Sequence, residues 1–352
     1  MKCCPECFGD RHLRKDIIPF KSIEIGRCSY CESENVPVLA PSQLSEKFEL
    51  LIEAYRPDPK GILLVQWFRE DWGLFDHARI DDSRAKDLLA EILDDGEIVR
   101  QPFSPSGIPV ADRLSEWGQL RDELMYRNRF FPAVDIDLDR LKGLLGHLKI
   151  DADEVPGSWY RARIQSGDTV FTIGEMGSPP RRTASYGRAN PAGIPYLYLG
   201  STPTTAISEI RPHTGEIACV ADFKTPHDLR FVDLRRPKKM VSPFVLADAE
   251  DIGRMRSDLP FLEQLGEELT RPVVPQAAAI DYIPSQYICE FIKKCGFDGV
   301  IYRSSVSDGI NLALFDPARA ESGDVMQYQV TRVSVDVTAA ETYKTATKPS
   351  AI

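Results

Sequence analysis

The sequence lacks the segments that would hold a chain in a membrane or direct it out of the cell. No run of apolar residues approaches the roughly 18 that a membrane-spanning helix needs. The first ten residues, MKCCPECFGD, have no apolar stretch of the kind found in secretion signals. We therefore expect a cytoplasmic protein without a membrane partner.

Positively charged residues are fewer than negatively charged ones. The chain has 43 Lys and Arg against 53 Asp and Glu, which gives a formal net charge of −10. Because affinity for a phosphate backbone comes from Lys and Arg that displace counterions, we do not expect nucleic acid as a partner. The sequence also has no Gly-x-Gly-x-x-Gly and no Gly-Lys-Ser/Thr segment, which argues against a Rossmann dinucleotide loop and a P-loop.

The composition that remains is that of a folded globular protein. The chain is 43% hydrophobic and 27% charged, and it has no low-complexity tract before its last few residues. At roughly 150 residues per domain, a length of 352 residues predicts two domains, each with its own core.

Four cysteines near the N-terminus are spaced like the ligands of one metal ion. They form two Cys-x-x-Cys pairs separated by residues 8 to 27, and the four are Cys4, Cys7, Cys28 and Cys31. Four thiolates complete a tetrahedral Zn²⁺ site and leave no position for water or substrate, so we predict a structural zinc site. Disulfides, which a reducing cytosol disfavours, and free thiols are the alternatives.

The other cysteines are assigned different roles. Cys3 competes with Cys4 as a ligand, although its spacing to the next cysteine is less usual for a knuckle. Cys219, Cys289 and Cys295 lie in apolar patterns, and we expect them to be buried thiols rather than ligands.

The part after the cysteines has the apolar spacing of helices. Leucines and aromatic residues recur every three to four positions in four segments, at 42–55, 83–95, 111–125 and 137–148. We therefore predict a zinc knuckle over residues 1–40 and a helical domain over residues 41–150. A polar segment with Pro156 and Gly157 then indicates a turn or linker.

Short β-rich runs dominate the second half. Runs with β-branched and aromatic residues lie at 159–164, 195–200, 217–223, 230–234, 298–304, 311–315 and 329–337. Helices are expected between them at 201–212 and 283–296. The fold class is therefore α+β, with a mixed α/β domain over residues 151–338 and a frayed tail over residues 339–352.

Several of these blocks resemble a known family. GRANPAGIPYLYL and TAISEIRP, followed by SQYICEFIKKCGFDGVIYRSS and GINLALF, are similar to the RES domain, which is named for an arginine, a glutamate and a serine. WYRAR resembles the opening strand of that family. The resemblance covers about residues 157 to 317 and places Arg188, Glu209 and Ser304 at the three named positions, with Ser305 as a less favoured register.

The resemblance implies a fold similar to that of ADP-ribosyltransferases and an enzyme that consumes NAD⁺. Members are commonly the toxin of a toxin–antitoxin pair, so NAD and an antitoxin protein are the expected partners, and the oligomeric state stays open between monomer and homodimer. The missing Rossmann loop agrees with such a NAD cleft. The acceptor stays open, because water, a protein side chain and phosphate all attack the same carbon. We prefer them in that order.

Five residues are expected to bind NAD: Arg161, Arg188, Asn190, Tyr198 and Ser304. The expected catalytic set is Arg188, Tyr198, Glu209 and Ser304. Arg161 is expected to contact the ligand, with Arg163 as its competitor on the same strand. Arg188 is expected to fork onto phosphate oxygens, and Asn190 in the same loop to make a minor contact. By pattern alone, an exposed loop arginine is the favoured interpretation of Arg188, and the family motif reverses it.

Glu209 is the expected catalytic carboxylate. Cleavage of the nicotinamide–ribose bond passes through a transition state like an oxocarbenium ion, which a nearby carboxylate stabilises. Ala206, Ile207 and Ile210 form the apolar stripe of its helix and leave position 209 off that stripe. A solvated helix glutamate is the alternative.

Tyr198 and Ser304 complete the expected site. The ring of Tyr198 would pack on nicotinamide or ribose and its hydroxyl would hold the reacting sugar, although Tyr196 on the same face makes a plain core tyrosine the alternative. Ser304 would bond a polar edge of the substrate, and a turn residue is its alternative reading.

A rival function concerns the helical domain. CPECFGD and NRFFP resemble parts of the HEPN-like domain found fused to RES domains, and HEPN ribonucleases carry an Arg-x4–6-His motif. Arg140 and His147 fit that spacing, but Leu141 stands where a polar residue is usual, and a histidine at a helix end is the alternative. RNA cleavage is therefore one alternative function, beside ADP-ribosylation of a protein through the same cleft and a binding module with an inactive cleft.

Overall fold

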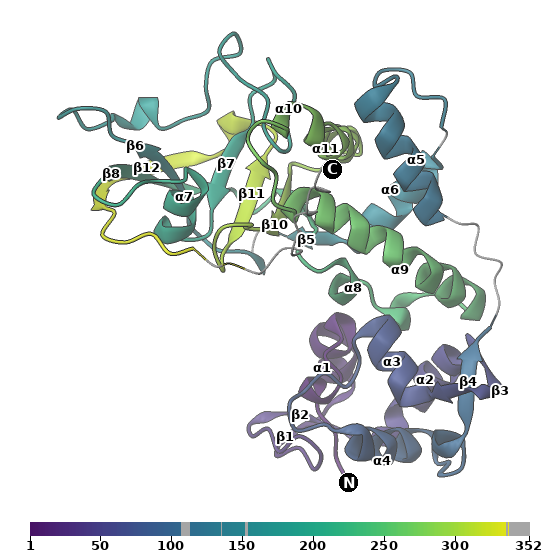
Figure 1. Cartoon of the computed structure of the whole chain (residues 1–352). Helices are drawn as coiled ribbons and strands as arrows, with labels where there is room; N and C mark the ends of the chain where they lie inside the picture. Colours follow the sequence, from purple (N-terminus) through teal and green to yellow (C-terminus); the bar gives the residue numbers. More distant parts are fainter. Residues whose placement is uncertain (107–112, 135, 152–153, 336, 338–352) are drawn as a thin grey trace, which may run out of the picture.

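The computed structural model describes residues 1–106, 113–134, 136–151, 154–335 and 337. The N-terminal part, purple to blue in Figure 1, combines short helices with two small two-stranded sheets. Its elements are η1 (Pro5–Cys7), the π-helical η2 (Leu13–Ile17), α1 (Ile18–Lys21), β1 (Glu24–Gly26), β2 (Val36–Val38), η3 (Pro41–Leu44), α2 (Ser45–Ile52), β3 (Tyr55–Leu63), α3 (Leu64–Trp72), α4 (Asp82–Leu93), η4 (Ile98–Arg100) and β4 (Pro102–Pro105).

The second part is built on one eight-stranded sheet with the order β12-β8-β6-β7-β11-β10-β9-β5. Only β9 and β10 run parallel, and the other neighbouring pairs are antiparallel. The strands are β5 (Lys149–Asp151), β6 (Trp159–Ile164), β7 (Leu197–Gly200), β8 (Ile217–Lys224), β9 (Arg230–Asp233), β10 (Gly299–Arg303), β11 (Ile310–Leu314) and β12 (Glu321–Gln329).

Helices pack on both the sheet and the N-terminal part. α7 packs against β6, β7 and β8, whereas α9 and α11 pack against β10. α9 also contacts α2 and α5, so it lies between the sheet and the N-terminal helices, as Figure 1 shows. The helices of this part are α5 (Arg113–Tyr126), α6 (Leu138–His147), α7 (Pro203–Glu209), α8 (Pro237–Met240), α9 (Ala249–Thr270), α10 (Ala278–Asp281) and α11 (Ile283–Lys294).

One continuous hydrophobic core joins the two parts. The ring of Phe48 in α2 lies 5.7 Å from Phe8 and 5.0 Å from Phe244, measured between centroids. Phe244 belongs to the second part of the chain, so the N-terminal helices bury their apolar face against it. None of the described helices combines the length and the apolarity needed to cross a membrane.

The α+β class is confirmed, and most expected strands of the sheet are found within one or two residues of their predicted ends. The strand expected at 329–337 is wrong within the described residues. β12 ends at Gln329, which pairs with Ile217, the first residue of β8, so the ladder has no further partner strand there. Val333 and Val335 beyond it are exposed.

The helical region contains a sheet that the sequence did not reveal. Tyr55, expected on the stripe of the first helix, instead begins β3, which pairs with β4. Pro57 cannot continue a helix, and it starts the strand's bulge. Gly61 in this bulge must lack a side chain, because a Cβ there would lie 1.9 Å from the carbonyl oxygen of Phe103.

The predicted domain limits stay predictions. The limit at residue 151 falls inside β5, which joins the eight-stranded sheet beside β9. The expected tail over residues 339–352 lies outside the described residues.

Candidate active site

A cleft of about 480 Å³ opens where two strands of the large sheet separate. β6 and β7 share only the residue pair Tyr160 and Gly200. Along the rest of their length β6 pairs with β8 and β7 pairs with β11. This volume is within the range of small-molecule sites. Its lining includes Arg161, Arg188, Tyr198, Glu209, Tyr282, Tyr302 and Asn311.

The helix α7 brings Glu209 to the cleft. Thr202 caps the helix, accepting a 3.0 Å hydrogen bond from the backbone N–H of Thr205, and Pro203 occupies its first turn. Gly200 allows the helix to approach β7, since a Cβ would lie 2.7 Å from the amide nitrogen of Ala206. The apolar face of α7 packs on Ala162 and Val220, as the predicted stripe requires, and Glu209 at the end of the helix is exposed to the cleft.

One oxygen of the Glu209 carboxylate is held by two buried donors. The Ser304 hydroxyl donates to Oε1 at 2.7 Å, and the Asn311 amide donates to the same atom at 2.6 Å. Ser304 and Asn311 are only 9% and 5% exposed. The structure thus brings the glutamate and the serine of the motif together. Ser305 is the serine that lines the cleft itself.

The guanidinium of Arg161 lies in the cleft wall, and no acidic side chain among the described residues pairs with it. It donates from Nη1 to the carbonyl oxygen of Tyr198 at 3.1 Å, whereas its Nε is buried without a hydrogen bond. Burial, followed by the charge of Arg163, lowers the pKa of Arg161 to about 10, so it remains charged at neutral pH. A buried and incompletely satisfied guanidinium favours an anionic ligand. Arg163 instead bonds to the Gly177 carbonyl oxygen and does not line the cleft.

Arg188 is held in place by the ends of α9 and α11. Its Nη1 donates to the carbonyl oxygen of Arg271 at 2.9 Å, and its guanidinium lies 5.1 Å from the centroid of the Tyr282 ring. The Ser285 hydroxyl donates to the backbone oxygen of Arg188 at 2.5 Å. No acidic side chain within the described ranges pairs with Arg188, so its remaining N–H groups are available to a ligand.

Tyr198 and Asn190 bond to each other and shape the loop that carries Arg188. The Tyr198 hydroxyl donates to Oδ1 of Asn190 at 2.7 Å and accepts from the backbone N–H groups of Ala189 and Asn190. The Asn190 amide donates to three backbone oxygens of the same loop. Their polar groups are therefore used inside the protein, and we reassign both residues from direct polar ligand contacts to positioning the loop. The ring of Tyr198 still lines the cleft.

Three cleft residues were not found from the sequence. Tyr282 stacks on Arg188, and Asn311 bonds to Glu209. Tyr302 lies in β10, and burial, followed by the negative charge of Glu209, raises its pKa well above the ordinary value. Asn311 left a signal in the sequence, because it is a polar residue at the start of the apolar run NLALF. Tyr282 and Tyr302 left none that separates them from core tyrosines.

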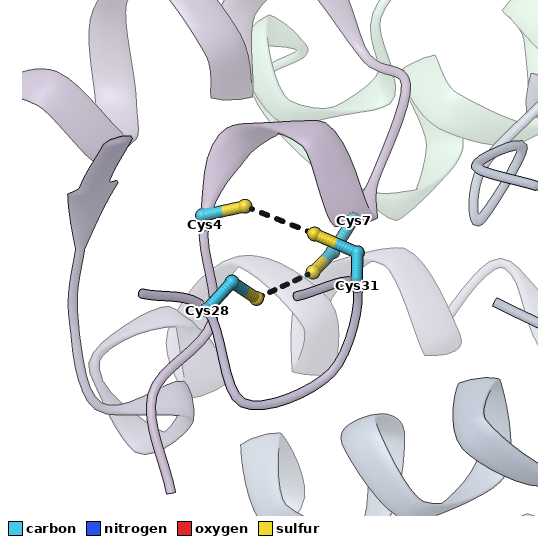
Figure 2. Close-up of side chains that lie close together, drawn as sticks. All are labelled: Cys4, Cys7, Cys28 and Cys31. Atoms are coloured by element: carbon cyan, nitrogen blue, oxygen red, sulfur yellow. Dashed lines mark hydrogen bonds between the residues drawn. The ribbon is translucent and has the colours of Figure 1, made fainter. Parts of the chain in front are cut away.

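The four cysteines of the N-terminal knuckles converge, as Figure 2 shows. Their sulfur atoms all lie within 4.8 Å of one another and are buried. The Sγ atoms of Cys4 and Cys31 are 3.4 Å apart and those of Cys7 and Cys28 are 3.3 Å apart, too far for disulfide bonds. A tetrahedral zinc with Zn–S bonds of about 2.3 Å requires separations of about 3.8 Å, so the cluster fits such an ion.

The remaining cysteines take no part in this cluster. Cys3 is buried and forms a backbone bridge with Leu39. Cys219 and Cys289 are buried, and Cys295 is partly exposed.

The two residues of the ribonuclease motif serve other contacts. Arg140 forms an ion pair through Nε and Nη2 with Asp258 of α9, which is 2% exposed. His147 is partly buried at the end of α6, and burial, followed by the charge of His12, lowers its pKa. Arg140 therefore joins α6 to α9, and nothing in this arrangement favours RNA cleavage.

Comparison with known proteins gives one family. The model of the RES domain matches residues 158–336, just over half of the 352-residue chain. None of the curated proteins matches. Among solved structures, the chain is similar to one in the crystal structure of the M. tuberculosis MbcT–MbcA toxin–antitoxin complex, at 14% identity over 53% of this chain and 92% of that chain. The TM-score is 0.29.

Proposed function

Because this chain belongs to the RES domain family, we propose that its cleft binds NAD⁺ and that the protein cleaves the bond between nicotinamide and ribose. The observation that carries this proposal is the Glu209 carboxylate, fixed by Ser304 and Asn311 in a cleft whose lining includes Arg161 and Arg188, neither of which has an acidic partner among the described residues. A dinucleotide supplies what such a cleft needs, namely two phosphates and a sugar on which positive charge develops.

The arginines are assigned to the pyrophosphate. Arg161 and Arg188 approach the cleft from β6 and from the loop before β7. No carboxylate among the described residues pairs with either guanidinium, and each has N–H groups without a hydrogen bond in this part of the chain. Guanidinium groups recognise phosphate oxygens through paired N–H donors. Tyr282, Val273 and Ala278 give the cleft an apolar wall against which a flat base or nicotinamide ring can pack.

Glu209 is assigned to the reacting sugar. When the bond between C1′ and the nicotinamide nitrogen breaks, its electron pair leaves with nicotinamide, and positive charge remains on C1′ and the ring oxygen. The negative carboxylate stabilises that charge. Water then attacks C1′, its proton passes to Glu209 and on to solvent, and the products are nicotinamide, ADP-ribose and a proton. We rank water ahead of a protein side chain, and both ahead of phosphate.

The family membership also supports a cellular role. We propose that the protein is the toxin of a toxin–antitoxin or defence system, that an antitoxin protein is its partner and that it acts in the cytoplasm. We further propose that the cysteine cluster holds one structural zinc ion. Nothing among the described residues supports a homodimer.

Two measurements test the proposal. Purified protein is incubated with NAD⁺ and, separately, with RNA, and nicotinamide release and RNA length are followed. In a bacterial host, induced expression should lower intracellular NAD⁺ before growth stops. Growth arrest with unchanged NAD⁺ and fragmented RNA would show that the helical region, not the cleft, carries the activity.

A further inference from the structure

Both hydrogen bonds on Glu209 come from one hairpin. β10 ends at Arg303, directly before Ser304, and β11 begins at Ile310, directly before Asn311. In the ladder Asn311 lies opposite Tyr302, another cleft residue. The hairpin therefore carries its two donors at its turn end, where they meet the end of α7.

We propose that Asn311 is a positioning residue that acts through Glu209. The inference rests on the proposed cleavage of NAD⁺. With Oε1 held by two donors, the carboxylate has one orientation. Its other oxygen, Oε2, has no hydrogen-bond partner in the described part of the chain, and it is the atom left for the substrate. In the same part of the chain, Oε1 of Glu209 is the acceptor that the Asn311 amide uses.

There is a chemical reason for the two donors to Glu209 being uncharged. Hydrogen bonds to a carboxylate stabilise its ionised form, which the reaction requires. A lysine or arginine at position 311 would also donate, but its charge would oppose the positive charge that develops on the ribose. An amide and a hydroxyl fix the carboxylate without adding charge. Because Ser304 and Asn311 are buried, water does not replace either donor readily.

The first test uses the pH dependence of nicotinamide release in two variants. Asn311→Ala removes the donor, so we expect turnover to fall by about 10- to 100-fold at every pH. Asn311→Asp has nearly the same shape and donates when protonated. Two carboxyl groups at hydrogen-bond distance keep one shared proton until the pH rises. Asn311→Asp should therefore retain turnover at acidic pH and lose it as the pH rises. Its pH profile then has a falling limb that the wild-type profile lacks.

The controls separate this role from a general loss of structure. Asn128→Ala removes an exposed amide from the loop after α5, and we expect the wild-type profile. Wild-type turnover in Asn311→Ala overturns the inference, and so does an Asn311→Asp profile without the new limb. If Asn311→Ala does not fold, Asn311→Asp decides, because its activity at acidic pH shows a folded chain.

A second measurement does not depend on turnover. The NMR signal of the Asn311 side-chain amide is identified by its absence in Asn311→Asp. We expect Glu209→Gln to shift this signal and Glu46→Gln, an exposed glutamate of α2, to leave it in place. A signal that Glu209→Gln leaves unchanged overturns the inference. If the shift occurs but the wild type releases no nicotinamide, the proposed function fails while the contact is established.

Discussion

The hydroxyl of Tyr198 donates a 2.7 Å hydrogen bond to Oδ1 of Asn190, eight positions earlier in the chain. Through this contact a strand residue fixes the loop that presents Arg188. Gly187 in that loop must lack a side chain, because a Cβ would lie 2.5 Å from the Tyr198 hydroxyl oxygen and 2.6 Å from Oδ1 of Asn190. The loop, its glycine and the tyrosine thus form one unit that sets the position of the phosphate-binding candidate.

The first prediction compares two tyrosines. Tyr198→Phe leaves two backbone N–H groups and the Asn190 oxygen without their partner, so we expect a loss of unfolding free energy on the order of 2 kcal/mol and weaker NAD⁺ binding. Tyr302→Phe removes a hydroxyl with no partner in the described structure, and stability should change little. Chemical denaturation and NAD⁺ titration of both variants check this. Equal stability losses in the two would contradict the assignment.

The second prediction separates catalysis from binding. Glu209→Gln keeps size and helix but removes the negative charge, so nicotinamide release should fall on the order of 100- to 1000-fold while NAD⁺ still binds. Arg188→Ala should instead weaken NAD⁺ affinity, because its assigned partner is phosphate. Glu46→Gln, an exposed glutamate in α2, is the matched control.

Turnover and NAD⁺ affinity measured on the same preparations distinguish a catalytic role from a binding role. Wild-type turnover in Glu209→Gln would exclude the mechanism. A Glu209→Gln protein that has lost only its NAD⁺ affinity would make Glu209 a binding residue.

The third prediction concerns the cysteine cluster. We expect one zinc ion per chain by elemental analysis, and Cys28→Ser should lose it and loosen the first forty or so residues. Nicotinamide release should persist, because the cleft is built from residues of the second part of the chain. Cys295→Ser, a partly exposed thiol outside the cluster, is the control. Zinc well below one ion per chain, in protein purified without chelator, would contradict the prediction.

The sequence was sufficient for the elements whose patterns are local. Thr202 and Pro203 mark the start of α7, and the apolar stripe of that helix correctly leaves Glu209 outside the core. The long helix α9 was not predicted because Gly253, Pro260 and Gly266 interrupt its pattern. Gly266 is explained only by packing, since a Cβ there would lie 2.7 Å from the carbonyl oxygen of Leu234.

For the site, too, the sequence indicates individual residues but not the contacts between distant ones. Family resemblance pointed to Arg188, Glu209 and Ser304, whose roles stay predictions, but it does not say which atoms meet. The bond between Asn311 and Glu209 joins residues 102 positions apart, so no local pattern records it. The polar groups of Asn190 were assigned to a ligand because the sequence does not show that backbone oxygens of its own loop take all its donors.

The last prediction tests the ribonuclease alternative through the ion pair between α6 and α9. Arg140→Gln leaves the buried carboxylate of Asp258 without its guanidinium, so the free energy of unfolding should fall by about 3 kcal/mol. His147→Ala should change stability less, because no described hydrogen bond holds its ring. Neither variant should differ from the wild type in its effect on RNA length. The reason is that Arg140 is bound to Asp258 and cannot reach a phosphate. Denaturation curves and RNA length measured for both variants and the wild type decide the matter: RNA cleavage that disappears in His147→Ala while the fold stays intact would restore the helical region as a catalytic domain.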